Sequence, residues 1–204
     1  MSRGLAAALI VAGLAGASAA AQSLAASAVA PPAPPGLPSA IPGLGGPFHL
    51  VDHTGTPRSD ADYRGRFMLV TFGYTACPDL CPLQLEKMAA ALDTLAPAIA
   101  GKVAPLFVSI DPAHDTPEHL AEYVAAFHPA IIGLTGSPAQ VGAVVRAYRV
   151  HVAVAAKAAG SSEGAIDHTG FFYLMGPDGG FLSLIMADAS ADEIAARVRK
   201  YAGS

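Results

Sequence analysis

The residues with the most specific chemistry in this chain are its two cysteines, which stand close together in the segment TACPDLCP at 75–82. Only three residues separate Cys77 from Cys81, so both sulfurs can point to the same side of one turn. Two such sulfurs can chelate a soft metal ion or oxidise to a disulfide. A purely structural disulfide closing so small a loop would contribute only about 2 kcal/mol. The spacing therefore favours a metal or redox site over a structural cross-link and leaves metal and redox open.

The elements on either side of the cysteines suit such a site. An apolar run at 67–72 is typical of a buried strand, and apolar residues from Leu85 to Ile99 recur at helical spacing. Pro82 suits the first turn of that helix. The cysteines thus lie at a strand-to-helix turn. Because a helix N-terminus stabilises negative charge, we expect it to lower the thiol pKa.

In the remaining sequence from residue 48 onward, the apolar patterns and capping signals predict strands that alternate with helices. This order indicates a mostly parallel sheet covered on both faces. The closing elements are a hairpin and a helix. This order predicts an α/β fold, a thioredoxin-like sandwich whose central mixed sheet has flanking helices. The expected elements are a front strand at 48–52, a strand at 103–110, a helix opening at Thr116, helices opening at Ser137 and Ser190 with capping boxes, and a hairpin of 171–175 with 181–185.

His168 is the histidine that this fold brings toward the cysteines. Of the seven histidines in the chain, it alone directly precedes the first strand of the closing hairpin. In a thioredoxin-like sheet, the start of that strand lies beside the loop that follows the first core strand. Two sulfurs and one ring nitrogen would form a trigonal site able to hold copper as Cu(I) and Cu(II). The alternative is a histidine that only bonds to backbone.

The first quarter of the chain differs in composition from the rest, because no charged residue occurs between Arg3 and Asp52. We interpret residues 1–21 as a signal peptide or N-terminal anchor and residues 22–47 as an Ala/Pro/Gly-rich linker. Residues 48–204 then form the thioredoxin-like domain. We expect an exported, periplasmic protein, either soluble or tethered to the inner membrane. The net charge of −4 does not suit a nucleic-acid binder.

Three motifs in order resemble the Sco/SenC family: FGYTACPDLCP at 72–82, VSIDPAHDTP at 108–117 and DHT at 167–169. The resemblance implies a copper-binding protein of thioredoxin fold that helps assemble cytochrome c oxidase. It implies that Cys77, Cys81 and His168 bind one copper ion. It further implies copper delivery to the dinuclear copper site of cytochrome c oxidase subunit II, or reduction of the thiols there, with another copper chaperone as a donor.

The alternative function is that of an enzyme, a thiol–disulfide oxidoreductase with Cys77 and Cys81 as catalytic residues acting on extracytoplasmic protein disulfides. Such proteins generally carry C-x-x-C and a proline just before the hairpin strand. Here the spacing is longer, and residues 165–170 contain a histidine but no proline. A redox or copper sensor is a further alternative. The sequence leaves transfer, reduction and sensing open.

Overall fold

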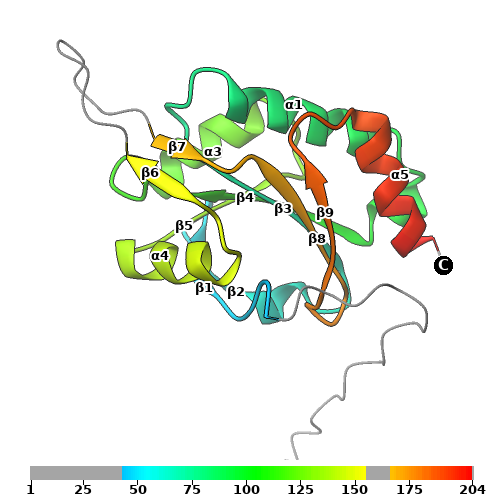
Figure 1. The fold of residues 1–204 in the computed structure, drawn as a ribbon, viewed down its shortest axis with the longest axis horizontal. Helices are drawn as coiled ribbons and strands as arrows, with labels where there is room; N and C mark the ends of the chain where they lie inside the picture. The colour runs from blue at the N-terminus through cyan, green and yellow to red at the C-terminus, as the bar shows by residue number, and fades with distance from the viewer. Residues whose placement is uncertain (1–42, 155–165, 204) are drawn as a thin grey trace, which may run out of the picture. The chain divides into compact units, whose positions relative to one another are not determined.

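A central seven-stranded sheet organises the protein, as seen in a computed structural model that describes residues 43–154 and 166–203. Its strand order is β2-β1-β5-β4-β3-β8-β9 (Figure 1). The neighbours β3, β4 and β5 are parallel, whereas β8 and β9 add to β3 as an antiparallel hairpin. The strands are β1 (His49–Asp52), β2 (Pro57–Ser59), β3 (Phe67–Gly73), β4 (Val103–Ser109), β5 (Ile132–Thr135), β6 (Val152–Val154), β7 (Ile166–His168), β8 (Phe171–Met175) and β9 (Phe181–Met186).

Helices cover both faces of this sheet. Figure 1 shows α1, α3 and α5 on one side and α4 on the other. Strands β3 and β4 are buried almost along their whole length, as expected of parallel strands with covered faces. The predicted thioredoxin-like mixed sheet with flanking helices is confirmed. The helices are η1 (Asp60–Tyr63), α1 (Leu80–Asp93), α2 (Pro97–Ala100), α3 (Pro117–Ala125), α4 (Pro138–Ala147) and α5 (Ala191–Ala202).

The helix starts follow the capping signals in the sequence. The Thr116 side chain accepts a hydrogen bond from the backbone N–H of His119. Ser137 and Ser190 both form complete capping boxes, at the starts of α4 and α5. Each cap satisfies backbone N–H groups that have no partner inside the helix. These local bonds fix where α3, α4 and α5 begin.

The short elements β2, η1, β6 and β7 were not predicted, and two longer parts of the chain also differ from the sequence prediction. Strand β5 lies between α3 and α4, where no strand was predicted; three of its four residues pair with β4 in the middle of the sheet. The single helix predicted from Leu85 to Ile99 is instead two helices, with α1 ending at Asp93 and α2 beginning at Pro97. The break arises because proline cannot donate a backbone hydrogen bond and disfavours helical geometry in the residue before it.

The predicted leader at 1–21 and most of the predicted linker at 22–47 lie outside the described residues. Leu44, within the predicted linker, is buried in the core cluster, and the N–H of Gly45 donates to the carbonyl of Ala147. The folded unit therefore includes residues slightly ahead of position 48. In residues 43–154 and 166–203, no helix has both the length and the apolar character needed to cross a membrane.

Candidate metal centre

Both cysteines lie where sequence analysis placed them, at the turn from β3 into α1. Cys77 sits in the loop and Cys81 in the first turn of the helix. Both are free thiols, and Cys81 is fully buried at 0% exposure. The backbone N–H of Cys81 donates to the Cys77 sulfur at 3.4 Å. A helix-terminal amide thus points at the Cys77 sulfur, an arrangement that stabilises negative charge there.

A buried carboxyl group, that of Asp115, anchors the start of the cysteine loop. It accepts hydrogen bonds from the Thr75 hydroxyl at 2.6 Å and from the Thr75 N–H at 3.2 Å. The Ser109 hydroxyl donates to it at 2.6 Å. Asp115 therefore ties the end of β4 to the residue two positions before Cys77. Sequence analysis missed this role and treated the surrounding stretch only as a turn capped by Thr116; nothing in the local pattern identifies its distant partner.

His168 reaches the cysteines from the other side, at the end of β7. Strand β7 pairs with β6, and this small hairpin places the ring beside Cys81. The distance from Cys81 Sγ to His168 Nε2 is 3.4 Å, and His168 Nδ1 lies 3.3 Å from the Thr169 carbonyl oxygen. Because a carbonyl can only accept, this contact is a hydrogen bond in the tautomer with the proton on Nδ1, which leaves the Nε2 lone pair facing Cys81 Sγ. That tautomer is the one a metal ligand needs.

Cys77, Cys81 and His168 form a compact group. Their sulfur and ring-nitrogen atoms all lie within 4.8 Å of one another, and in the described part of the chain no other three metal-binding side chains meet in this way. The remaining six histidines thus stand apart from this group. The side chain of Asp167, the neighbour of His168, is outside the described residues.

Two glycines allow the close packing around the site. A Cβ atom on Gly73 would lie 2.7 Å from Cys81 Sγ and 2.8 Å from the Phe107 ring. A Cβ on Gly170 would lie 2.9 Å from a methyl group of Leu80. Both approaches are shorter than ordinary van der Waals contact. The absence of side chains at these positions lets α1 and the chain after His168 close around the thiols.

Burial changes the acidity expected of the second thiol. The pKa of Cys81 is raised above its ordinary value, first because burial disfavours the thiolate and second because of its hydrogen bond with Cys77. The expectation of a lowered pKa is therefore wrong for Cys81, because desolvation outweighs the helix N-terminus. Without metal, this thiol keeps its proton at neutral pH. A bound cation would have to displace that proton.

The donor set fits a soft metal ion. Two thiolates and one imidazole favour copper or zinc over oxygen-seeking cations such as Mg²⁺ and Ca²⁺. Three donors also leave room for an incoming ligand from another molecule. The same two sulfurs are near enough for oxidation to a disulfide after a small movement. The arrangement can therefore bind and release a thiophilic ion, exchange disulfides, or do both.

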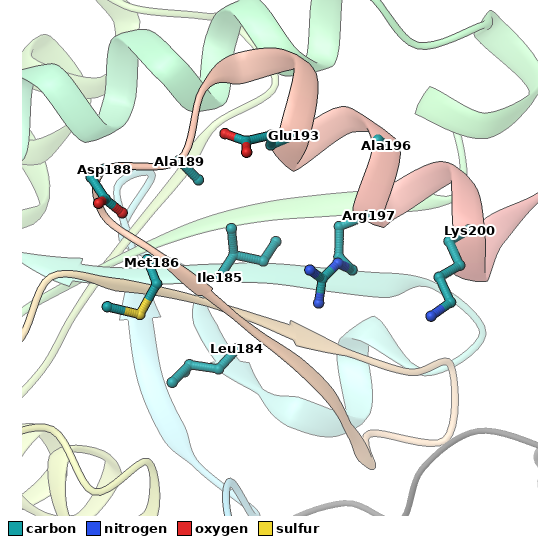
Figure 2. Close-up of a pocket in the computed structure, with 9 residues that line it drawn as sticks. All are labelled: Leu184, Ile185, Met186, Asp188, Ala189, Glu193, Ala196, Arg197 and Lys200. Atoms are coloured by element: carbon teal, nitrogen blue, oxygen red, sulfur yellow. The ribbon is translucent and has the colours of Figure 1, made fainter.

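A separate surface hollow does not share this chemistry. A cavity of about 700 Å³ lies between β9 and α5. Figure 2 shows its lining residues, with apolar Leu184 and Met186 on the strand and charged Glu193, Arg197 and Lys200 on the helix. None of the three site residues lines it. The hollow contains neither sulfur nucleophiles nor imidazole groups among its lining residues, so the chemistry lies at the Cys77, Cys81 and His168 group.

A thioredoxin-like fold with two thiols and a histidine at the β3–α1 turn defines a thiol-based metal or redox protein. The SCO1/SenC family profile matches residues 39–203, and the chain belongs to this family. It is 44% identical over 158 residues to the human "Protein SCO1 homolog, mitochondrial", covering 77% of this chain and 52% of that protein. It is 38% identical over 161 residues to Schizosaccharomyces pombe "Protein sco1", covering 78% and 61%.

The likeness extends to solved structures. The crystal structure of yeast Sco1 with copper bound superimposes with a TM-score of 0.73 at 36% identity, covering 80% of this chain and 90% of that one. The chain spans about half to three fifths of the length of the curated relatives described above. The part matched by the family profile, residues 39–203, contains the thioredoxin-like unit of this chain together with Cys77, Cys81 and His168.

Proposed function

We propose that this protein is a copper metallochaperone in which Cys77, Cys81 and His168 hold one copper ion per chain. The observation that carries the proposal is the convergence of two sulfurs and one imidazole nitrogen within 4.8 Å. Family membership and the copper-bound yeast relative support copper as the ion. The soft donors agree with Cu(I), and the imidazole extends the site to Cu(II).

The chemistry follows from the protonation states of the ligands. Loading with copper would release the protons of the Cys77 and Cys81 thiols to solvent and use the lone pair of His168 Nε2, while Nδ1–H keeps its bond to the Thr169 carbonyl oxygen. Unloading would reverse these steps: acceptor thiolates replace the chaperone's ligands on copper, and the Cys77 and Cys81 sulfurs take up protons again. The raised pKa of Cys81 favours this last step, because the buried thiol is more stable protonated.

The acceptor proposed is the dinuclear copper site of cytochrome c oxidase subunit II, with another copper chaperone as donor. A second candidate activity uses the same residues. In thiol reduction, the free Cys77 and Cys81 thiols would form a mixed disulfide with an oxidised acceptor and then a disulfide with each other. The acceptor disulfide takes up two electrons and two protons. The two adjacent reduced thiols favour this activity, which would prepare acceptor thiols for metal.

The proposed organisation places the chaperone outside the cytoplasm. Residues 1–21 would act as a signal peptide or anchor, the residues from 22 to about 42 as a linker, and the residues from 43 onward as the copper-binding domain. The leader composition supports export, and the location proposed is the periplasm, with the protein free or tethered to the inner membrane. N-terminal sequencing and fractionation of protein from cells test this: a mature chain starting near residue 22 is expected if the leader is cleaved.

The test of the function separates transfer from reduction. Copper-loaded protein is mixed anaerobically with reduced subunit II domain, and copper-free protein with the oxidised domain. Copper moving to the reduced domain supports the chaperone role. Disulfide reduction without copper supports the reductase role. Failure in both assays contradicts the assignment to this acceptor, and a sensor remains the alternative to examine by deletion.

A further inference from the structure

A buried amide without a hydrogen-bond partner lies next to the proposed copper site. The Gln84 side chain is only 1% exposed, and neither its Nε2 nor its Oε1 has a partner among the described residues. A buried polar group without a partner is costly, and native proteins rarely keep one without a use for it. Gln84 takes no part in the site as described so far.

Helix geometry places Gln84 against the site. It follows Cys81 by three positions in α1 and is buried with it. Side chains with this spacing have Cβ atoms about 5–6 Å apart. Long helical side chains also lean toward the helix N-terminus, which brings the Gln84 amide back toward Cys81. Leu80, four positions before Gln84, packs beside Gly170, which follows His168 by two residues.

We propose that Gln84 is a positioning residue for copper, donating an Nε2–H hydrogen bond to Cys81 Sγ when that sulfur is a metal-bound thiolate. The inference rests on the proposed copper-binding function. A neutral thiol is a weak acceptor, whereas an anionic sulfur accepts a stronger, charge-assisted bond. In the metal-free protein the amide has no partner, so a small turn of the side chain toward the Cys81 thiolate would give it one on loading. This difference shifts the equilibrium toward the copper-bound form.

The composition of the chain allows a direct readout. It contains three glutamines, Gln22, Gln84 and Gln140, and no asparagine. The side-chain NH₂ region of a ¹⁵N–¹H correlation spectrum should thus contain three pairs of signals. The pair absent from Gln84→Met is that of Gln84. Gln140 caps α4 through Ser137 and serves as an internal reference.

We expect one Gln84 amide proton to move downfield when Cu(I) is added to the parent protein, while the Gln140 pair stays in place. Gln84→Met removes the amide and keeps the side-chain length. It should weaken Cu(I) binding by about tenfold to a hundredfold in competition with a chromophoric chelator. Because it also removes the unpartnered amide, metal-free Gln84→Met should melt at or above the temperature of the parent. If Gln84 were only structural, its replacement would lower the melting temperature of the metal-free protein, so weaker Cu(I) binding without a loss of stability indicates a role in positioning copper.

Leu85→Met is the matched control, since Leu85 is also fully buried and lies four positions after Cys81. It should leave Cu(I) affinity within a factor of two of the parent. If Gln84→Met does not fold, Gln84→Leu replaces it. The shift of the Gln84 signals on Cu(I) addition is measured in the parent protein, so this test does not depend on copper binding by a variant. A Gln84 pair that does not move, or unchanged affinity in the variant, overturns the inference while copper binding stands. A parent that takes up no Cu(I) overturns the proposed function and this inference together.

Discussion

Replacing Asp115 by alanine should destabilise the fold far more than removing an exposed carboxylate. Asp115 is 1% exposed and accepts from the Thr75 hydroxyl, the Thr75 N–H and the Ser109 hydroxyl. The alanine variant leaves these donors without an acceptor. Each buried donor left unpaired costs about 1–3 kcal/mol, and Thr75 can recover part of this from water. We therefore expect a loss of about 3 kcal/mol in the free energy of unfolding.

Thermal unfolding followed by circular dichroism measures this loss. A domain of this size loses about 2–4 °C per kcal/mol, so the melting temperature of Asp115→Ala should fall by roughly 6–12 °C. Asp93→Ala is the control, because Asp93 is exposed and pairs with His128, and such pairs contribute about 0–1 kcal/mol. If the two variants melt within a degree of each other, Asp115 does not anchor the cysteine loop and our explanation of that loop is wrong.

Three further predictions concern acidity, the third ligand and packing. The pKa of Asp52 is lowered to about 2: burial opposes the shift, but hydrogen bonds from Thr54 and Arg58 outweigh it. Its stabilisation is thus complete above about pH 4 and lost as pH falls toward 2, so in urea titrations Asp52→Asn should cost about 2 kcal/mol at pH 7 and little at pH 2. His168→Ala should weaken Cu(I) binding by at least about tenfold in chelator competition, whereas alanine at the exposed His151 should not; equal losses would remove His168 from the site. Gly73→Ala should lower the free energy of unfolding by about 1–3 kcal/mol through overlap with Cys81 Sγ, and a neutral result in chemical denaturation would show that the site is loosely packed.

Local signals in the sequence were sufficient for much of the fold. The Ser137 and Ser190 caps and the 171–185 hairpin depend on neighbouring residues, so they could be predicted. Strand β5 has only four residues, and its state is decided by pairing with β4, which a local pattern does not reveal. Pro97 is a local signal for a helix break, but the prediction followed the helical spacing of the apolar residues around it and gave one continuous helix.

The candidate site divides in the same way. Cys77 and Cys81 are close in the chain, and His168 could be placed because the fold class fixes where its strand begins. The anchoring by Asp115 and the burial that raises the Cys81 pKa are consequences of tertiary packing. The unpartnered Gln84 amide likewise becomes visible only when neighbours from other elements are known. The convergence of these three residues was thus predictable, whereas the burial and hydrogen bonds around them were not.

X-ray absorption at the copper K-edge tests the central claim most directly. Protein loaded with one equivalent of Cu(I) should show two sulfur ligands and one nitrogen ligand, and His168→Ala should lose the nitrogen while keeping both sulfurs. A copper ion surrounded only by oxygen or nitrogen, or a spectrum identical in parent and His168→Ala, would contradict a site built from Cys77, Cys81 and His168.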